Sequence, residues 1–158
     1  AQLRRARNLG IGCNFFSNHL WFWGDQHHDI TLGSDRASQM NPAASAARLG
    51  IPFTLHSDAS VTPIGQLHTM WAAINRQTVS GRTLGENEAI SPAIALQATT
   101  LGAAYLLHLD HLIGSLETGK FADMTVLADD PLKVDPNDIR NIEVRDTIVG
   151  GAVTSENI

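Results

Sequence analysis

An aspartate that follows an apolar stretch is the residue best placed for chemistry. Residues 51–56 (IPFTLH) predict a buried strand, and Ser57 and Asp58 follow it directly. In parallel α/β folds, ligands and catalytic groups collect at the carboxyl ends of strands. His56 lies two residues before Asp58, so an extended strand would point both side chains to one face. The pair could ligate a metal ion or share a proton; the alternative is that Asp58 caps the helix that follows.

A second group of polar and aromatic residues lies in residues 18–32, a stretch without helical or strand period that predicts a long loop. The group comprises His19, Trp21, Phe22, Trp23, Asp25, His27, His28 and Asp29. Imidazoles and carboxylates suit divalent metals, and aromatic rings beside polar groups suit a substrate pocket. The alternative is a surface loop with satisfied side chains, which we favour for His27, His28 and Asp29. His19 and Asp25 remain candidates for a binding role.

The surrounding elements predict a parallel sheet built from βα units. We expect a helix at residues 1–8, a strand at 11–17, a helix from the cap Asn41 to Gly50 and a strand at 51–56. A helix from the cap Thr62 and a helix that starts at Ser91 and Pro92 and runs to about Leu109 follow. Helices and strands that alternate at this spacing indicate a parallel α/β fold. From residue 113 the pattern becomes β-rich, and Gly150 and Gly151 indicate a hairpin turn.

Composition excludes several classes of protein. The chain has 158 residues, 43% of them hydrophobic, which fits one ordinary domain with a core. A formal charge of −5 leaves no basic stripe for a nucleic acid. No apolar run is long enough to predict a membrane span. Cys13 is the only cysteine, which excludes an internal disulfide and favours the reducing cytoplasm.

A run that imitates a phosphate loop is rejected. Residues 114–120 follow the Gly-x-x-x-x-Gly-Lys spacing, but Phe121 stands where a Ser or Thr is needed, and a strand rather than a helix is expected next. The sequence therefore does not predict nucleotide binding.

Several stretches resemble the amidohydrolase superfamily. Residues 114–127 (GSLETGKFADMTVL) closely resemble a phrase common near the C-terminus of that superfamily, where the chain returns from the barrel to a small β-sandwich. Residues 53–63 (FTLHSDASVTP) resemble the eighth-strand motif of its amidohydrolase-3 group, which includes N-substituted formamide deformylase-like and exoenzyme-regulatory-type proteins. Residues 15–25, 71–76 and 80–85 look like the same group, in the same order. One departure within the motif is Ser60, where the group usually has Pro.

The resemblance implies a metal-dependent hydrolase of an amide-like C–N bond in a small-molecule substrate. Asp58 matches the aspartate at the end of the eighth strand, which in the family binds the metal and acts as general base. His56, His19, Trp23 and Asp25 match motif positions whose role is less settled, and we place them at the substrate mouth. The implied cofactor is a divalent metal, with zinc favoured.

The resemblance also implies a partial fold, because a whole (β/α)8 barrel takes about 250 residues. Residues 1–112 would hold its last two βα units, strands seven and eight with their helices, and residues 113–158 the C-terminal strands of a small β-sandwich domain. The expected His ligands of the first six strands lie outside this chain, and a catalytic zinc site needs about three protein ligands.

We therefore expect the isolated chain to be inactive, since Asp58 alone cannot hold a catalytic ion. Open strand edges and core faces would favour self-association or association with the missing barrel portion. The alternative is a non-catalytic binding or regulatory module derived from the same fold.

Overall fold

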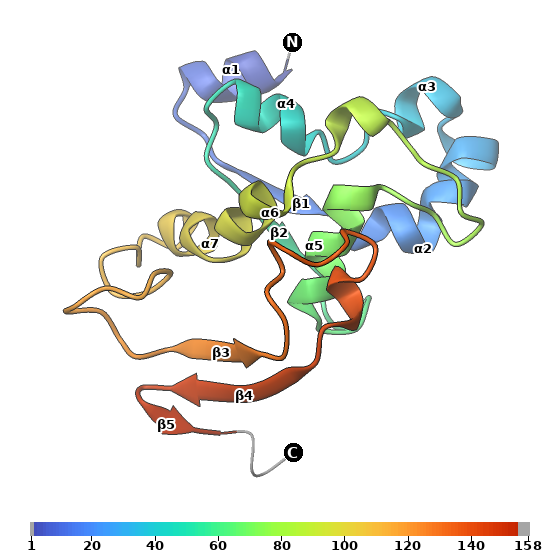
Figure 1. The fold of residues 1–158 in the computed structure, drawn as a ribbon. Coiled ribbons are helices and arrows are strands. Elements are labelled where there is room, and N and C mark those ends of the chain that lie inside the picture. Colours follow the sequence, from blue (N-terminus) through green and yellow to red (C-terminus); the bar gives the residue numbers. More distant parts are fainter. Residues whose placement is uncertain (1, 155–158) are drawn as a thin grey trace.

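A computed structural model describes residues 2–154 of the chain (Figure 1). Its helices and strands are α1 (Gln2–Asn8), β1 (Cys13–Phe16), α2 (Asn18–Gln26), α3 (Ser34–Ala37), α4 (Ala43–Arg48), β2 (Phe53–His56), α5 (Gln66–Asn75), α6 (Pro92–Thr99), α7 (Leu101–Leu106), β3 (Met124–Leu127), β4 (Val144–Val149) and β5 (Ala152–Val153). A π-helical turn, His27–Thr31, continues α2, and two 3₁₀ turns cover Glu86–Glu88 and Ile139–Asn141. The expected mixed α/β fold is confirmed. In the described residues no helix is long and apolar enough to cross a membrane.

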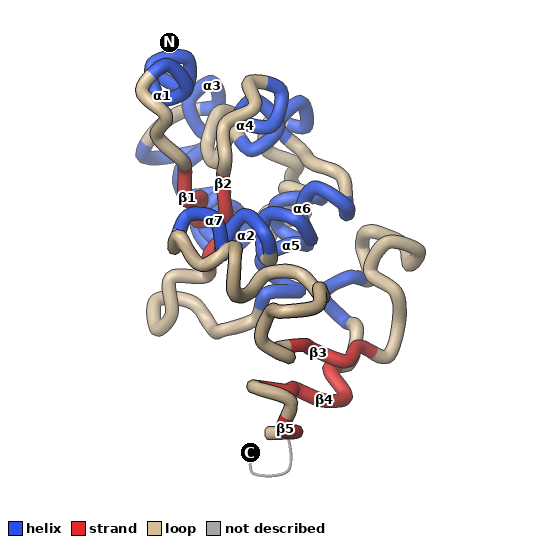
Figure 2. The backbone as a smooth tube through the Cα atoms, turned by 90° about the vertical axis from the view of Figure 1, so that its left-hand side faces the viewer, coloured by secondary structure: helices blue, strands red, loops and turns tan. Residues whose placement is uncertain are grey.

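Two parallel strands form the centre of the fold. β1 pairs with β2 in a register that sets Cys13 opposite Phe53 and Phe16 opposite His56. The two strands run side by side with helices around them (Figure 2). Phe15 and Phe53 project from them and meet with ring centroids 5.7 Å apart. Because the strands are parallel, the residues that follow each of them lie at one edge of the sheet.

Helix α5 forms one wall of the core. The spacing of an amphipathic helix predicts four core-facing positions, Leu67, Met70, Trp71 and Ile74. Leu67 is partly buried and the other three are buried. The helix ends at Arg76, whose backbone is left-handed (φ 52°) and whose side chain is fully buried. The core of buried residues comprises Phe15, Ala43, Ala44, Ala46, Ile51, Phe53, Leu55, Met70, Ala73, Ile74, Ile90, Ala95, Ala98 and Ile139.

The prediction of a loop at residues 18–32 is wrong. The segment is helical, although Gly24 and a run of aromatic residues weaken its intrinsic helix propensity. Tertiary packing stabilises it: Leu20 is fully buried, and a Cβ at Gly24 would lie 2.6 Å from Cγ2 of Thr78. The glycine therefore allows the helix to pack closely against residues 78–84.

Two predicted helix caps are also wrong. Asn41 precedes α4 but has φ 47°, and its Nδ2 donates a hydrogen bond to the Phe16 carbonyl at 2.9 Å. Thr62 does not start a helix, since α5 begins at Gln66 with Gly65 as its cap. Ser91 does cap a helix: its hydroxyl accepts from the amide of Ile94 at the start of α6. The single helix expected there divides at Thr100 into α6 and α7.

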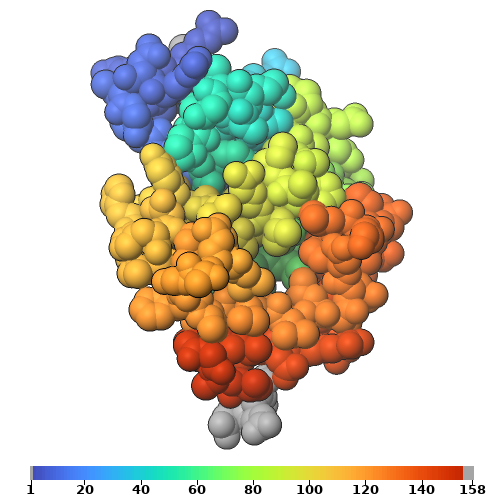
Figure 3. Space-filling view, turned by 60° about the vertical axis from the view of Figure 1, so that its left-hand side comes forward, coloured from blue at the N-terminus to red at the C-terminus, as the bar shows by residue number. Residues whose placement is uncertain are grey.

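The C-terminal part is a separate antiparallel sheet, as the β-rich pattern predicts. The strands lie in the order β3-β4-β5, and β4 turns into β5 at Gly150 and Gly151, both with positive φ. This sheet and the N-terminal helix α1 occupy opposite ends of the molecule (Figure 3). The turn at residues 139–141 connects the sheet to the core, because Ile139 is fully buried and Arg140 stacks on Trp71 of α5.

Candidate functional site

The candidate site lies where β1 and β2 end. Phe16 is the last residue of β1, and its ring stacks on His56, the last residue of β2, with centroids 5.1 Å apart. The opposite stacking partner of Phe16 is His19, in the first turn of α2, also at 5.1 Å. Trp23, one turn further along α2, meets the His19 ring edge to face at 5.1 Å. The structure thus assembles His19, Trp23 and His56 around one phenylalanine.

Asp58 lies beside this cluster on the turn that leaves β2. The residue is exposed and has a left-handed backbone (φ 53°), and its carbonyl accepts a hydrogen bond from the amide of Val61. Strand β2 ends at His56, so the expected strand alternation does not extend to Asp58. The charge of Asp58 still reaches the His19 ring, where it acts to raise the pKa.

The Asp58 carboxylate is not used to build the fold. Among residues 2–154, no donor makes a hydrogen bond or ion pair with it, and the helix-cap alternative does not hold because α5 begins eight residues later, at Gln66. The turn is held by other groups: the Thr62 hydroxyl bonds to the Ser57 carbonyl and accepts from Asn18 Nδ2 at 2.9 Å. The turn is therefore fixed while the carboxylate stays open to a ligand.

Burial and a second histidine lower the pKa of His19. The pKa of His19 lies below its ordinary value, first because the ring is partly buried and then because His27 adds positive charge nearby, an effect that Asp58 opposes. The Nε2 atoms of His19 and His27 are 3.1 Å apart. The neutral imidazole is therefore the favoured form of His19 near pH 7.

Asp25, also expected at the substrate mouth, lies in a different setting. Its carboxylate accepts hydrogen bonds from the hydroxyls of Thr78 and Ser80 at 2.8 and 2.7 Å and from the Ser80 amide at 3.1 Å. Burial alone would raise the pKa of Asp25, but these bonds and the nearby charge of Arg82 lower it. The structure does not join Asp25 to the Phe16 cluster, and its part in substrate binding stays a prediction.

The sequence does not single out Phe16, and for His27 it favours a satisfied side chain on a surface loop. His19, Trp23 and His27 follow the i, i+4, i+8 spacing of one helical face, but that signal has meaning only if the segment is a helix. The sequence predicts Phe16 only as a residue of a buried strand. Its role as the centre of a ring stack depends on the parallel register with His56.

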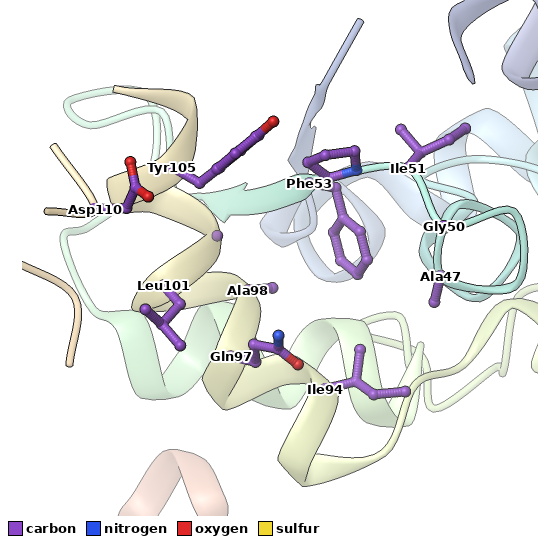
Figure 4. A pocket seen from close by; sticks show the side chains of 12 residues that line it. Ala47, Gly50, Ile51, Phe53, Ile94, Gln97, Ala98, Leu101, Tyr105 and Asp110 are labelled. Atoms are coloured by element: carbon purple, nitrogen blue, oxygen red, sulfur yellow. The ribbon is translucent and has the colours of Figure 1, made fainter. Parts of the chain in front are cut away.

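A groove lies away from these residues. It has a volume of about 560 Å³ and is lined by residues that precede β2, such as Gly50 and Ile51, and by α6 and α7, including Leu101 and Tyr105 (Figure 4). None of the candidate site residues lines it. It borders the amino end of β2, whereas ligands of parallel sheets bind at the carboxyl ends.

Comparison with known proteins decides the family. The model of the amidohydrolase family matches residues 1–155. The chain belongs to the amidohydrolase family. The resemblance stated from residues 53–63 and 114–127 is thereby confirmed.

Relatives of this amidohydrolase-family chain are much longer than it is. It is 27% identical to the N-substituted formamide deformylase of Arthrobacter pascens over 98% of its own length and 29% of the relative. It is 27% identical to the putative amidohydrolase YtcJ of Bacillus subtilis, over 79% of its length and 24% of the relative. It is 34% identical to the protein LONG AFTER FAR-RED 3 of Arabidopsis thaliana, over 76% of its length and 21% of the relative. The chain thus spans under a third of these curated relatives.

Solved structures share the fold of this amidohydrolase-family chain. An uncharacterized metal-dependent hydrolase from Pyrococcus horikoshii matches with a TM-score of 0.71 at 22% identity, over 85% of this chain and 28% of that one. An adenosine deaminase from Xanthomonas campestris with bound zinc matches with a TM-score of 0.67 at 19% identity, over 96% and 34%. At these identities the matches show the fold alone, and the fold of this chain is a part of theirs.

Proposed function

We propose that this chain is the C-terminal part of a metal-dependent hydrolase that cleaves an amide-like C–N bond. Family membership supports this, as do relatives whose names describe a formamide deformylase and metal-dependent hydrolases. The observation that carries the proposal is Asp58, a carboxylate that directly follows a central parallel strand and makes no hydrogen bond within residues 2–154. Its side chain is exposed, whereas the family match predicts a carboxylate that points inward from the rim of a barrel. A carboxylate that the fold does not use is available for a metal or a proton.

The residues of the chain fit one part of a metal centre. Asp58 offers a hard oxygen donor of the type that zinc sites include. Within the described residues no group of three or more His, Cys, Asp and Glu could hold an ion by itself. Catalytic zinc sites use about three protein ligands, so Asp58 would be one ligand and the others would come from outside this chain. When bound, a divalent ion there would lower the pKa of water to about 7 and polarise a carbonyl.

The side chains of this chain then have defined tasks. Asp58, as general base, accepts a proton from the water that adds to the carbonyl carbon. The C–N bond breaks, the proton passes from Asp58 to the departing nitrogen, and a carboxylic acid and an amine result. His19, Trp23 and His56, ordered by Phe16, would form an aromatic wall that orients the substrate.

Association is part of the proposal. The described sheet of β1 and β2 has two strands, so each has an edge without a partner strand within residues 2–154. Such edges pair readily with further strands. We expect these edges to pair with strands of the missing barrel portion. When that portion is absent, we expect them to pair with a second copy of this chain.

The test is an assay of N-substituted formamide hydrolysis. The purified chain with added zinc is expected to show no turnover, and its mixture with the polypeptide encoded directly upstream is expected to show turnover that a chelator abolishes. Turnover by the chain alone would refute the partial-enzyme proposal. If the mixture forms a complex and still shows no turnover, the non-catalytic module replaces the hydrolase.

A further inference from the structure

The pair His19 and His27 is a candidate metal site separate from Asp58. The two Nε2 atoms lie 3.1 Å apart, while the ring planes meet at 85° with centroids 4.7 Å apart. The short centroid distance shows that the rings are angled rather than end to end. Two imidazole nitrogens bound to one zinc ion at about 2.0–2.1 Å lie about 3.0–3.4 Å apart, so the observed spacing suits a shared ion.

The ring of His27 is held in the orientation that a metal ligand needs. The π-helical turn brings Thr31 next to it, and His27 Nδ1 lies 2.7 Å from the Thr31 hydroxyl. When Nδ1 carries the proton and donates it to this hydroxyl, Nε2 keeps a free lone pair directed towards His19. Metal-binding histidines are commonly fixed in this way, through a hydrogen bond at the other ring nitrogen.

The ring of His19 is held by packing. It stacks on Phe16 and meets Trp23 edge to face, and its Nε2 lies 3.1 Å from Nε2 of His27. Both histidines are only partly buried, and an ion can reach them. Asp58 does not complete a three-ligand set with the pair within the described residues.

We infer that His19 and His27 bind one transition-metal ion through their Nε2 atoms, at a site distinct from the one to which Asp58 belongs. Imidazole ligands suit Cu²⁺, Ni²⁺ and Zn²⁺, and a site with two nitrogens should follow the order Cu²⁺ above Ni²⁺ and Zn²⁺. Water would fill the remaining coordination positions. The inference does not depend on hydrolase activity.

Calorimetric titration of the 158-residue chain with Cu²⁺, Ni²⁺ and Zn²⁺ tests the site. One ion is expected per chain, and His27→Ala should weaken binding by at least about tenfold. His28→Ala is the matched control, because His28 is the neighbouring histidine on the same turn and bonds to Asp29 rather than His19. Thr31→Val should weaken binding about 10-fold while leaving both ligands in place.

A spectroscopic measurement covers the case in which His27→Ala does not fold. The electron paramagnetic resonance spectrum of the Cu²⁺ form should show coupling to two nitrogens in the native chain and to one in His27→Gln. Asp58→Asn should keep the coupling to two nitrogens, because the proposed ligands are the two imidazoles, and this separates the site from the proposed hydrolase centre. Absence of binding, equal loss in His28→Ala, or loss of the two-nitrogen coupling in Asp58→Asn would each overturn the inference.

Discussion

Two acidic residues from neighbouring parts of the molecule differ in how their carboxylates are bonded. Asp25 is tied to the turn at residues 78–82 by three hydrogen bonds and an ion pair with Arg82. Asp58 has no such bond within residues 2–154 and is exposed at the end of β2. Both lie in stretches that resemble the family, but the resemblance implies a defined role only for Asp58. The difference shows that the fold uses the carboxylate of Asp25 for structure and does not use that of Asp58.

The turn region that binds Asp25 is built around a buried cation. Arg76 donates to the carbonyls of Leu84 at 2.6 Å, Met40 at 2.7 Å and Asn41 at 3.0 Å. Burial lowers its pKa to about 10, an effect that the charge of Glu88 opposes. Here the fold uses the buried charge of Arg76 for structure, whereas the exposed charge of Asp58 at the end of β2 has no bond within residues 2–154.

The largest effect on stability is expected at Arg76. Arg76→Met preserves packing volume but removes the donors to the buried carbonyl of Leu84 and the part-buried carbonyl of Met40. We expect a loss of about 3–5 kcal/mol of unfolding free energy. Urea denaturation measures this. Arg82→Met, at a part-exposed site, should cost less than about 1 kcal/mol. Equal losses in both variants would show that Arg76 is not the centre of the turn region.

A smaller loss is expected at Asp25. Asp25→Ala removes three hydrogen bonds from a part-exposed turn and should cost about 1 kcal/mol. Since the folded pKa of Asp25 is depressed, its contribution is present above the unfolded value of 3.8 and is lost as pH falls through the folded pKa. The difference in unfolding free energy between the native chain and the variant should therefore narrow as pH falls below 3.8. A difference that widens as pH falls would contradict this.

Some elements on both sides of this comparison are predictable from the sequence, and others are not. The strand at residues 51–56, the amphipathic helix before Arg76 and the Ser91 cap follow from local patterns, and the structure has them. The helix that bears His19 and His27 does not, because packing of Leu20 and Gly24 overrides weak propensity. Asn41 and Thr62 carry strong cap signals, yet their side chains hold the ends of β1 and β2 through partners far along the chain.

A pH effect is expected at His68. Its ring stacks on Trp71, its Nε2 is buried without a partner within the described residues, and burial followed by the charge of Arg140 lowers its pKa. The unfolded state then binds more protons, so unfolding free energy should fall as pH drops below about 6.5. His68→Phe should flatten this slope in denaturation curves from pH 8 to pH 5, with His111→Phe as an exposed control. His19, whose pKa is also lowered, should account for a remaining slope.

The smallest change in stability is expected at Asp58. Asp58→Asn removes no hydrogen bond of the fold, so the unfolding free energy should change by less than about 0.5 kcal/mol. Urea denaturation beside Asp25→Ala checks the comparison directly. A loss at Asp58 as large as that at Asp25 would mean that the fold uses both carboxylates alike.

The most direct test of the hydrolase assignment is the turnover number of the Asp58→Asn chain in complex with the polypeptide encoded upstream, measured on an N-substituted formamide. Loss of a positioned general base lowers the rate by about 10²–10⁴-fold, and loss of a metal ligand adds to this. We predict a fall of at least about 100-fold with assembly and stability unchanged. A variant that assembles and turns over at the native rate would contradict the assignment of Asp58.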